Sequence, residues 1–371
     1  MKTASKEFIK GSEAIAKAIF LARPEVISAY PITPQTHIME TLEKYSLKNK
    51  RFRFIQADSE LAAASMVLGA SAAGARAYTA SSSQGLLLMA EALYNIAGLR
   101  LPVVMTVANR AISGPINIWN DHSDAMAVRD STWIMLFAEN SQETIDLQIA
   151  AFAIAEKTQL PVMVNVDGFL ITHAFEEVEF PRQTDVDKFL GKRKVDKNNV
   201  LAPKSPLSLG TLFLPEHYGS YRKNLGTDLS NAHVTIEYEL QRYAKICHQT
   251  KRRNLEYYGP KNPQKIILAI GSIIGTIKAA VEKRPDYQKI GIIKIVSYRP
   301  FPSKEIKQYC LGAKKVIILE KVSNYNNFGP LAQDVLTAGV KLEKIKSFAV
   351  GLGGEDVSEE QINKIINSVK I

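Results

Sequence analysis

From residue 12 to residue 176, apolar runs of strand length alternate with longer amphipathic runs that are typical of helices. Because such a chain buries its apolar strands by placing helices on both faces of a parallel sheet, the alternation predicts an α/β fold. We expect strands at 26–30, 52–56, 77–80, 102–108, 134–138 and 161–167. We expect helices at 13–21 with Ser12 as the cap, at 34–45, at 58–74, after the turn 81–85 as far as 96, and at 141–156.

The composition changes near residue 180, where lysine, arginine, asparagine, proline and tyrosine become frequent and the periodicity weakens. Residues 181–262 contain too many aromatic side chains for a disordered segment, so we expect an ordered connector packed on the first domain, 1–180. Its one periodic stretch predicts a helix at 237–248. A second α/β domain is expected at 263–371, with strands at 265–270, 292–297, 316–319 and 347–350 and a helix ending at 282.

The composition excludes several classes of protein. Hydrophobic residues make up 46% and charged residues 23%, as in globular proteins. Cys247 and Cys310 stand far apart with no metal-ligand spacing, so we expect no disulfide scaffold, zinc site or iron–sulfur cluster in this chain. The most apolar run, 86–108, is interrupted by Glu91 and Arg100, and the N-terminus has no signal-peptide core, so we predict a cytoplasmic protein without membrane contact.

The net charge of +10 raises the question of nucleic-acid binding. The densest basic clusters, 191–194 and 251–253, lie in polar connecting sequence and lack the interleaved aromatics of a binding motif. We therefore expect solvated surface, or contact with an acidic partner subunit, and no nucleic acid.

Residues 30–34 read Tyr-Pro-Ile-Thr-Pro between an expected strand and an expected helix. Pro34 suits the first turn of a helix because it lacks an N–H, and Thr33 then stands at the N-cap. In an open α/β sheet, ligands bind at the carboxyl ends of the strands. The turn is either a simple helix cap or part of a site.

Two charged residues follow expected strands at the same edge. Glu60, in a first helical turn, either balances the helix dipole or bonds a ring nitrogen of a heteroaromatic ligand. Arg110 either binds a carboxylate substrate with its planar fork or forms a surface salt bridge. His122, in the polar loop 121–124, is better suited to a structural hydrogen bond than to acid–base work.

Other patterns are incomplete. The turn 271–276 follows a strand but lacks the full Gly-x-Gly-x-x-Gly pattern, which favours close packing over a phosphate cradle. No Gly-Asp-Gly followed by asparagine is present to hold Mg²⁺ and a diphosphate. If this chain takes part in redox chemistry, other chains must supply the metal and the electron route.

Taken together, these segments resemble the alpha subunit of 2-oxoacid:ferredoxin oxidoreductases, most closely the pyruvate:ferredoxin type. The resemblance covers nearly the whole chain and depends on the order and spacing of eight segments: 11–14, 30–36, 58–60, 82–86, 100–102, 120–124, 166–169 and 298–302.

This resemblance implies a thiamine-diphosphate pyrimidine-binding domain followed by a transketolase C-terminal-like domain. It implies conversion of pyruvate, CoA and oxidised ferredoxin into acetyl-CoA, CO₂ and reduced ferredoxin, only together with partner subunits. A beta subunit would bind the diphosphate and Mg²⁺, and [4Fe-4S] clusters would lie in partner chains, among them a ferredoxin-like delta subunit beside a gamma subunit.

The resemblance also implies residue roles. Glu60 matches the glutamate that bonds the pyrimidine N1′ and favours the imino tautomer. Thr33 and Arg110 match residues that hold the 2-oxoacid carboxylate. Pro31 matches a position lining the cofactor pocket, with Thr33 beside it, and Gln84 is a further candidate for cofactor binding.

The sequence departs from the family pattern at Asp58, where glutamate is frequent, and at Thr132, where glycine is usual and a different local turn is therefore expected. Residues 114–116, Gly-Pro-Ile, favour pyruvate. A branched-chain or 2-oxoglutarate specificity, and a non-catalytic assembly subunit, remain the alternatives.

Overall fold

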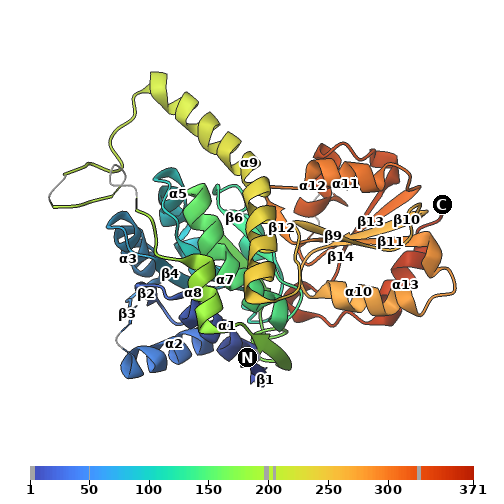
Figure 1. Cartoon of the computed structure of the whole chain (residues 1–371). Coiled ribbons are helices and arrows are strands. Elements are labelled where there is room, and N and C mark those ends of the chain that lie inside the picture. Colours follow the sequence, from blue (N-terminus) through green and yellow to red (C-terminus); the bar gives the residue numbers. More distant parts are fainter. Residues whose placement is uncertain (1–4, 50, 196–199, 204–205, 324–326) are drawn as a thin grey trace.

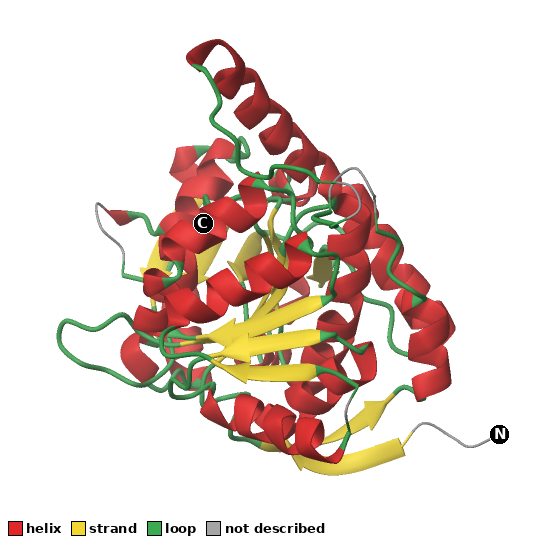
Figure 2. Ribbon diagram, turned by 90° about the vertical axis from the view of Figure 1, so that its left-hand side faces the viewer, coloured by secondary structure: helices red, strands yellow, loops and turns green. Residues whose placement is uncertain are grey.

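The computed structural model describes residues 5–49, 51–195, 200–203, 206–323 and 327–371. Its larger sheet has seven strands in the order β12-β6-β7-β5-β4-β2-β3, and all neighbours are parallel except β12 and β6. The strands are β2 (Val26–Ala29), β3 (Arg53–Gln56), β4 (Ala77–Ser81), β5 (Val104–Asn109), β6 (Ile134–Phe137), β7 (Val162–Asp167) and β12 (Ser297–Arg299). Figure 2 shows parallel strands side by side between helices. The predicted parallel sheet with helices on both faces is confirmed.

Neighbouring residues of the central strands point to opposite faces and enter different cores. Val104 packs with α1 (Gly11–Ala22) and α7 (Ser141–Thr158), whereas Met105 packs with α3 (Glu60–Ala72) and α5 (Ala90–Gly98). The remaining helices of this unit are α2 (Thr36–Lys48), α4 (Ser83–Leu88) and α6 (Ser123–Ala127). Ser12 does not cap α1 as predicted; it lies buried inside the helix, and the cap position is Lys10.

The smaller sheet has the order β14-β13-β10-β11-β9, parallel except between β9 and β11. Its strands are β9 (Leu255–Tyr258), β10 (Lys265–Ala269), β11 (Ile290–Ile295), β13 (Lys315–Glu320) and β14 (Ile345–Ala349). Its helices are α10 (Ile273–Glu282), α11 (Ser303–Cys310), α12 (Pro330–Thr337) and α13 (Glu359–Ser368), with short 3-10 turns at Tyr287–Lys289, Leu342–Lys344 and Leu352–Gly354. The domain boundaries at residues 180 and 262 stay a prediction. The strand β12, which follows the boundary at residue 262 in the chain, pairs with β6 in the sheet of the first domain.

The connecting region contains more regular structure than the sequence predicted. Just before it, an antiparallel ribbon joins β1 (Ser5–Lys10) to β8 (Phe175–Phe180), and α8 (Gln183–Leu190) opens the connecting region itself. The helix predicted at 237–248 is the end of α9 (Pro215–Cys247), which has 33 residues. Figure 1 shows its first turns projecting beyond the body of the molecule and its last turns beside α7 and α8. None of the described helices is both long and apolar enough to cross a bilayer.

The turn at Thr132 and the two basic clusters, 191–194 and 251–253, have structures that the sequence did not predict. Thr132 has φ 68°, the left-handed conformation that favours glycine, so the turn keeps a glycine-like backbone despite its β-branched residue. The basic clusters are not simply solvated surface. Arg252 binds the buried Asp146 at 3.1 Å, and Arg193 donates to the carbonyl of Ala75. One arginine of each cluster is therefore bonded to an acceptor inside the protein instead of being solvated.

Candidate active site

Three neighbouring strands of the larger sheet end at one edge. After β2 comes the turn containing Thr33, after β4 come residues 82–85, and after β5 comes Arg110. Because these strands are parallel and adjacent, their carboxyl ends bring the three segments together. The sequence prediction that these residues share an edge is consistent with this topology.

Thr33 is not an N-cap. The helix α2 begins at Thr36, and the N–H groups of Gln35 and Thr36 donate to the carbonyl of Ile32 at 2.8 and 3.1 Å. The buried Gln35 side chain also donates to the carbonyl of Ala80 in β4 at 3.0 Å. This link fastens the turn to the neighbouring strand and leaves the side chain of Thr33 exposed at the edge.

Arg110 is 7% exposed and is held by two carbonyl oxygens. Its Nη1 donates to the carbonyl of Thr33 at 3.0 Å, and its Nε donates to the carbonyl of Asn117 at 3.0 Å. Burial lowers the pKa of the guanidinium, and the nearby charge of Asp124 opposes that effect. Two of five N–H donors are used by these bonds, so three remain for a ligand.

Glu60 is the first residue of α3, and the Ser59 hydroxyl caps that helix by accepting from the N–H of Ala62 at 3.1 Å. Glu60 is 7% exposed, and no described residue donates a hydrogen bond to its carboxylate or pairs with it; its oxygens are not among the buried atoms without a partner, so they reach the surface at this edge. A Cβ at Gly85 would lie 2.5 Å from Glu60 Oε1. A carboxylate that is open at the surface of a mostly buried residue is free to accept from a ligand that brings its own N–H, and covering it without such a donor would be costly.

Gln84 lies next to this contact. Its Oε1 accepts from the Ser83 hydroxyl at 2.6 Å, while its Nε2 is buried and has no acceptor among the described residues. The free amide hydrogens suit a ligand acceptor, as expected for cofactor binding. Pro31 lies exposed at the start of the Thr33 turn.

Asp124 is a residue that the sequence reasoning missed. It lies in the first turn of α6, completely buried, and accepts hydrogen bonds from the backbone N–H groups of Ser83 and Arg110. The sequence held two signals: Asp124 closes the segment 120–124 of the family resemblance, and it stands close behind a candidate substrate-binding arginine.

His122 has a structural role, as predicted. Its Nε2 lies 2.6 Å from Asp167 Oδ1, and both side chains are buried. Asp167 also accepts from Lys321 Nζ at 2.7 Å and from the N–H of Ser272 at 3.1 Å, at the start of α10. Although burial raises the pKa of Asp167, the positive charges of Lys321 and His122 outweigh that effect and hold it well below its usual range.

The Asp167 carboxylate therefore occupies the space beside the turn 271–276. A Cβ at Gly271 would lie 2.9 Å from Asp167 Oδ1, so glycine permits the close approach of the two α/β units. This agrees with the prediction of close packing at this turn. The Asp167 carboxylate accepts the N–H of Ser272 at the start of α10, where a phosphate cradle would present its N–H groups to a ligand.

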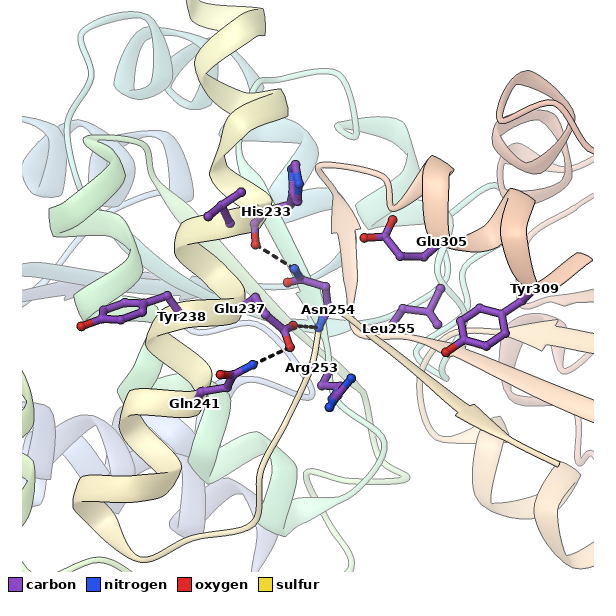
Figure 3. Close-up of a pocket in the computed structure, with 10 residues that line it drawn as sticks. His233, Glu237, Tyr238, Gln241, Arg253, Asn254, Leu255, Glu305 and Tyr309 are labelled. Atoms are coloured by element: carbon purple, nitrogen blue, oxygen red, sulfur yellow. Dashed lines mark hydrogen bonds between the residues drawn. The ribbon is translucent and has the colours of Figure 1, made fainter. Parts of the chain in front are cut away.

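A cavity of about 470 Å³ lies elsewhere, between α9, the segment 253–255 and α11 (Figure 3). Asn254 bridges its walls, donating its Nδ2 to the carbonyl of His233 at 2.8 Å and its N–H to Glu237 at 2.9 Å. None of the predicted site residues lines this cavity, so it does not host the predicted chemistry.

Comparison with known proteins identifies the family. A family described as pyruvate flavodoxin/ferredoxin oxidoreductase, thiamine diphosphate-binding, matches residues 17–240. Another, described as pyruvate:ferredoxin oxidoreductase core domain II, matches residues 264–362.

Similar proteins cover nearly the whole chain. It is 40% identical to pyruvate synthase subunit PorA of Pyrococcus abyssi, over 98% of this chain and 93% of the relative. The PorA subunit of Thermotoga maritima is also 40% identical, over 96% and 92%. Ketoisovalerate oxidoreductase subunit VorA of Pyrococcus abyssi is 33% identical, over 98% and 93%.

The fold matches a solved structure of 2-oxoglutarate:ferredoxin oxidoreductase from Magnetococcus marinus, with a TM-score of 0.78 at 21% identity. The match covers 99% of this chain and 66% of that longer one, slightly under two thirds. Given the two family matches and the full-length relatives, the chain belongs to the alpha subunits of the 2-oxoacid:ferredoxin oxidoreductases.

Proposed function

We propose that this chain is the alpha subunit of pyruvate synthase, which converts pyruvate and CoA reversibly to acetyl-CoA and CO₂ with transfer of electrons to ferredoxin. The higher identity to the pyruvate synthase subunits than to the ketoisovalerate subunit supports this specificity. The proposal places the enzyme in the cytoplasm.

The observation that carries the proposal is the Glu60 carboxylate, which is open at the strand-end edge on a residue that is only 7% exposed, and to which no described residue donates a hydrogen bond. Thiamine diphosphate, when bound, supplies a carbon nucleophile and a place for the electrons left by departing CO₂. Glu60 would accept a hydrogen bond from the aminopyrimidine ring, and the Gln84 amide would donate to it. Gly85 keeps the space beside the carboxylate free of a side chain.

Arg110 would hold the carboxylate of the 2-oxoacid. The carbonyl oxygens of Thr33 and Asn117 fix the plane of the guanidinium, so its remaining N–H groups present a rigid fork. The exposed Thr33 hydroxyl would add a hydrogen bond to the same substrate, and Pro31 would line the pocket beside it. Fixed charge and orientation of this kind lower the entropic part of the barrier.

Partner subunits would complete the enzyme. We assign the diphosphate and Mg²⁺ to a beta subunit, because this sequence lacks the Gly-Asp-Gly motif that would hold them. The [4Fe-4S] clusters would lie in partner chains, including a ferredoxin-like delta subunit, with a gamma subunit completing the assembly and ferredoxin as the external acceptor.

The test is to purify this chain with the subunits that co-purify with it and to assay the complex with pyruvate, 2-oxoisovalerate and 2-oxoglutarate. The proposal expects pyruvate to give the highest kcat/KM, with CoA-dependent reduction of ferredoxin. A preference for 2-oxoisovalerate would support the branched-chain alternative. Activity that does not change on loss of Glu60 would support an assembly subunit.

A further inference from the structure

Asp124 stands at the first turn of α6 with both carboxylate oxygens bonded. Its Oδ2 accepts the backbone N–H of Ser83 at 2.9 Å and of Arg110 at 3.0 Å. Its Oδ1 accepts the Asn109 side-chain N–H at 3.0 Å and the N–H of Ala125 at 2.7 Å. The Asp124 carboxylate thus accepts four N–H hydrogen bonds, three from the backbone and one from a side chain.

The charge of this group is expensive to bury. Asp124 is completely buried, and no described cation forms an ion pair with it. Burial raises the pKa of Asp124 to about 6, while the hydrogen bonds from Asn109 and from three backbone N–H groups work against that rise. Only a carboxylate accepts two N–H groups at each oxygen, because an amide would turn its own N–H₂ toward one pair of donors.

The four bonds connect the two halves of the site. Ser83, with φ 48°, begins α4 and precedes Gly85, which lies against Glu60. Arg110 follows β5 and reaches the Thr33 carbonyl. A displacement of Asp124 would therefore move the segment that faces the cofactor ring and the arginine that faces the substrate.

We infer that Asp124 is a positioning residue that fixes Arg110 relative to Glu60, so that its loss weakens the binding of substrate and cofactor together. The inference rests on the proposed function. It differs from a purely structural role because it predicts a linked change in two binding constants.

The experiment uses the assembled complex with Asp124→Asn. We expect the KM for pyruvate to rise about tenfold, the effect of about one lost hydrogen bond to a charged group. Thiamine diphosphate affinity, measured by calorimetry without substrate, should fall by a similar factor, while kcat stays within about threefold.

The matched control is Asp146→Asn. Asp146, on α7, is also completely buried, and burial raises its pKa to about 7, but it binds Arg252 and is not part of the proposed site. Its variant should be less stable without a change in either binding constant. Equal effects of the two variants on both constants would overturn the inference.

A double-mutant cycle tests whether Asp124 acts through Arg110. In an Arg110→Ala background, Asp124→Asn should no longer raise the KM for pyruvate, whereas additive effects would contradict the inference. If Asp124→Asn does not assemble, Asp124→Glu carries the test, because it keeps the charge but is one methylene longer. Wild-type binding constants for Asp124→Glu would then overturn it.

The two proposals fail differently. A wild-type complex that binds no thiamine diphosphate would refute the proposed function. A wild-type complex that binds it, with an Asp124→Asn variant of unchanged constants, would refute only the role of Asp124.

Discussion

The Glu60 carboxylate lies directly against Gly85, with no space between them for even a methyl group. A Cβ at Gly85 would meet Glu60 Oε1 at 2.5 Å and Ser81 Oγ at 2.6 Å. The position of the carboxylate therefore depends on the absence of a side chain at Gly85, in the first turn of α4.

Gly85→Ala should displace Glu60 and lower turnover by about 100-fold, since misplacing a catalytic group by about 1 Å has effects of that size. Steady-state kinetics of the assembled complex will measure it. Gly69→Ala, an exposed site in α3 with no atom within 4 Å of its Cβ, is the control and should keep full activity. Equal activity of the two variants would contradict the proposed role of the Glu60 contact.

Glu60→Gln should leave assembly intact and lower kcat by about 100-fold or more, because a neutral amide can accept the hydrogen bond of a ring N–H but can neither exchange a proton with the ring nor stabilise its positive charge. The control is Glu91→Gln. Glu91 is an exposed first-turn glutamate of α5, and it shares with Glu60 only the favourable position in the helix dipole. Normal turnover of Glu60→Gln would remove the central support for the proposal.

Arg110→Ala should raise the KM for pyruvate by about 100-fold, as expected on loss of a charge-assisted pair. Arg110→Lys should recover only part of that loss, since lysine lacks the planar fork. Thiamine diphosphate affinity, which the arginine side chain does not determine, is the internal control. An unchanged KM for Arg110→Ala would exclude it from substrate binding.

Asp167→Asn should lower the free energy of unfolding at pH 7 by about 3–5 kcal/mol, because it leaves the buried Lys321 without its partner. The native pKa of Asp167 lies below the unfolded value of about 3.9. Its contribution is therefore complete above that unfolded value and declines as the pH falls below it. Denaturant unfolding of both proteins at pH 7 and pH 3 will measure this, and a difference independent of pH would contradict the assignment.

The sequence predicted the sheet because buried strands and amphipathic helices have distinct periods. It did not predict the first two thirds of α9, because residues 211–220 are all exposed and Gly219 and Gly226 weaken the helical signal. A helix that packs along only part of its length shows no apolar stripe in the remainder.

At the site, the shared edge expected for Glu60 and Arg110 followed from the alternation of strands and helices, because the carboxyl ends of parallel strands lie at one edge. The prediction of Thr33 as an N-cap was wrong and the role of Asp124 was not predicted, and both errors have the same cause. Gln35 reaches Ala80, 45 residues away, and Asp124 reaches Ser83, 41 residues away. Contacts at that separation arise only when the strands pair, so no local pattern records them.

Arg110 holds position 33 by its backbone carbonyl, not by its side chain. Every residue type carries that oxygen. The position of the Arg110 guanidinium is thus independent of which amino acid stands at position 33, whose side chain is exposed at the edge. The side chain at that position can therefore change its own contact with a ligand while the arginine stays in place.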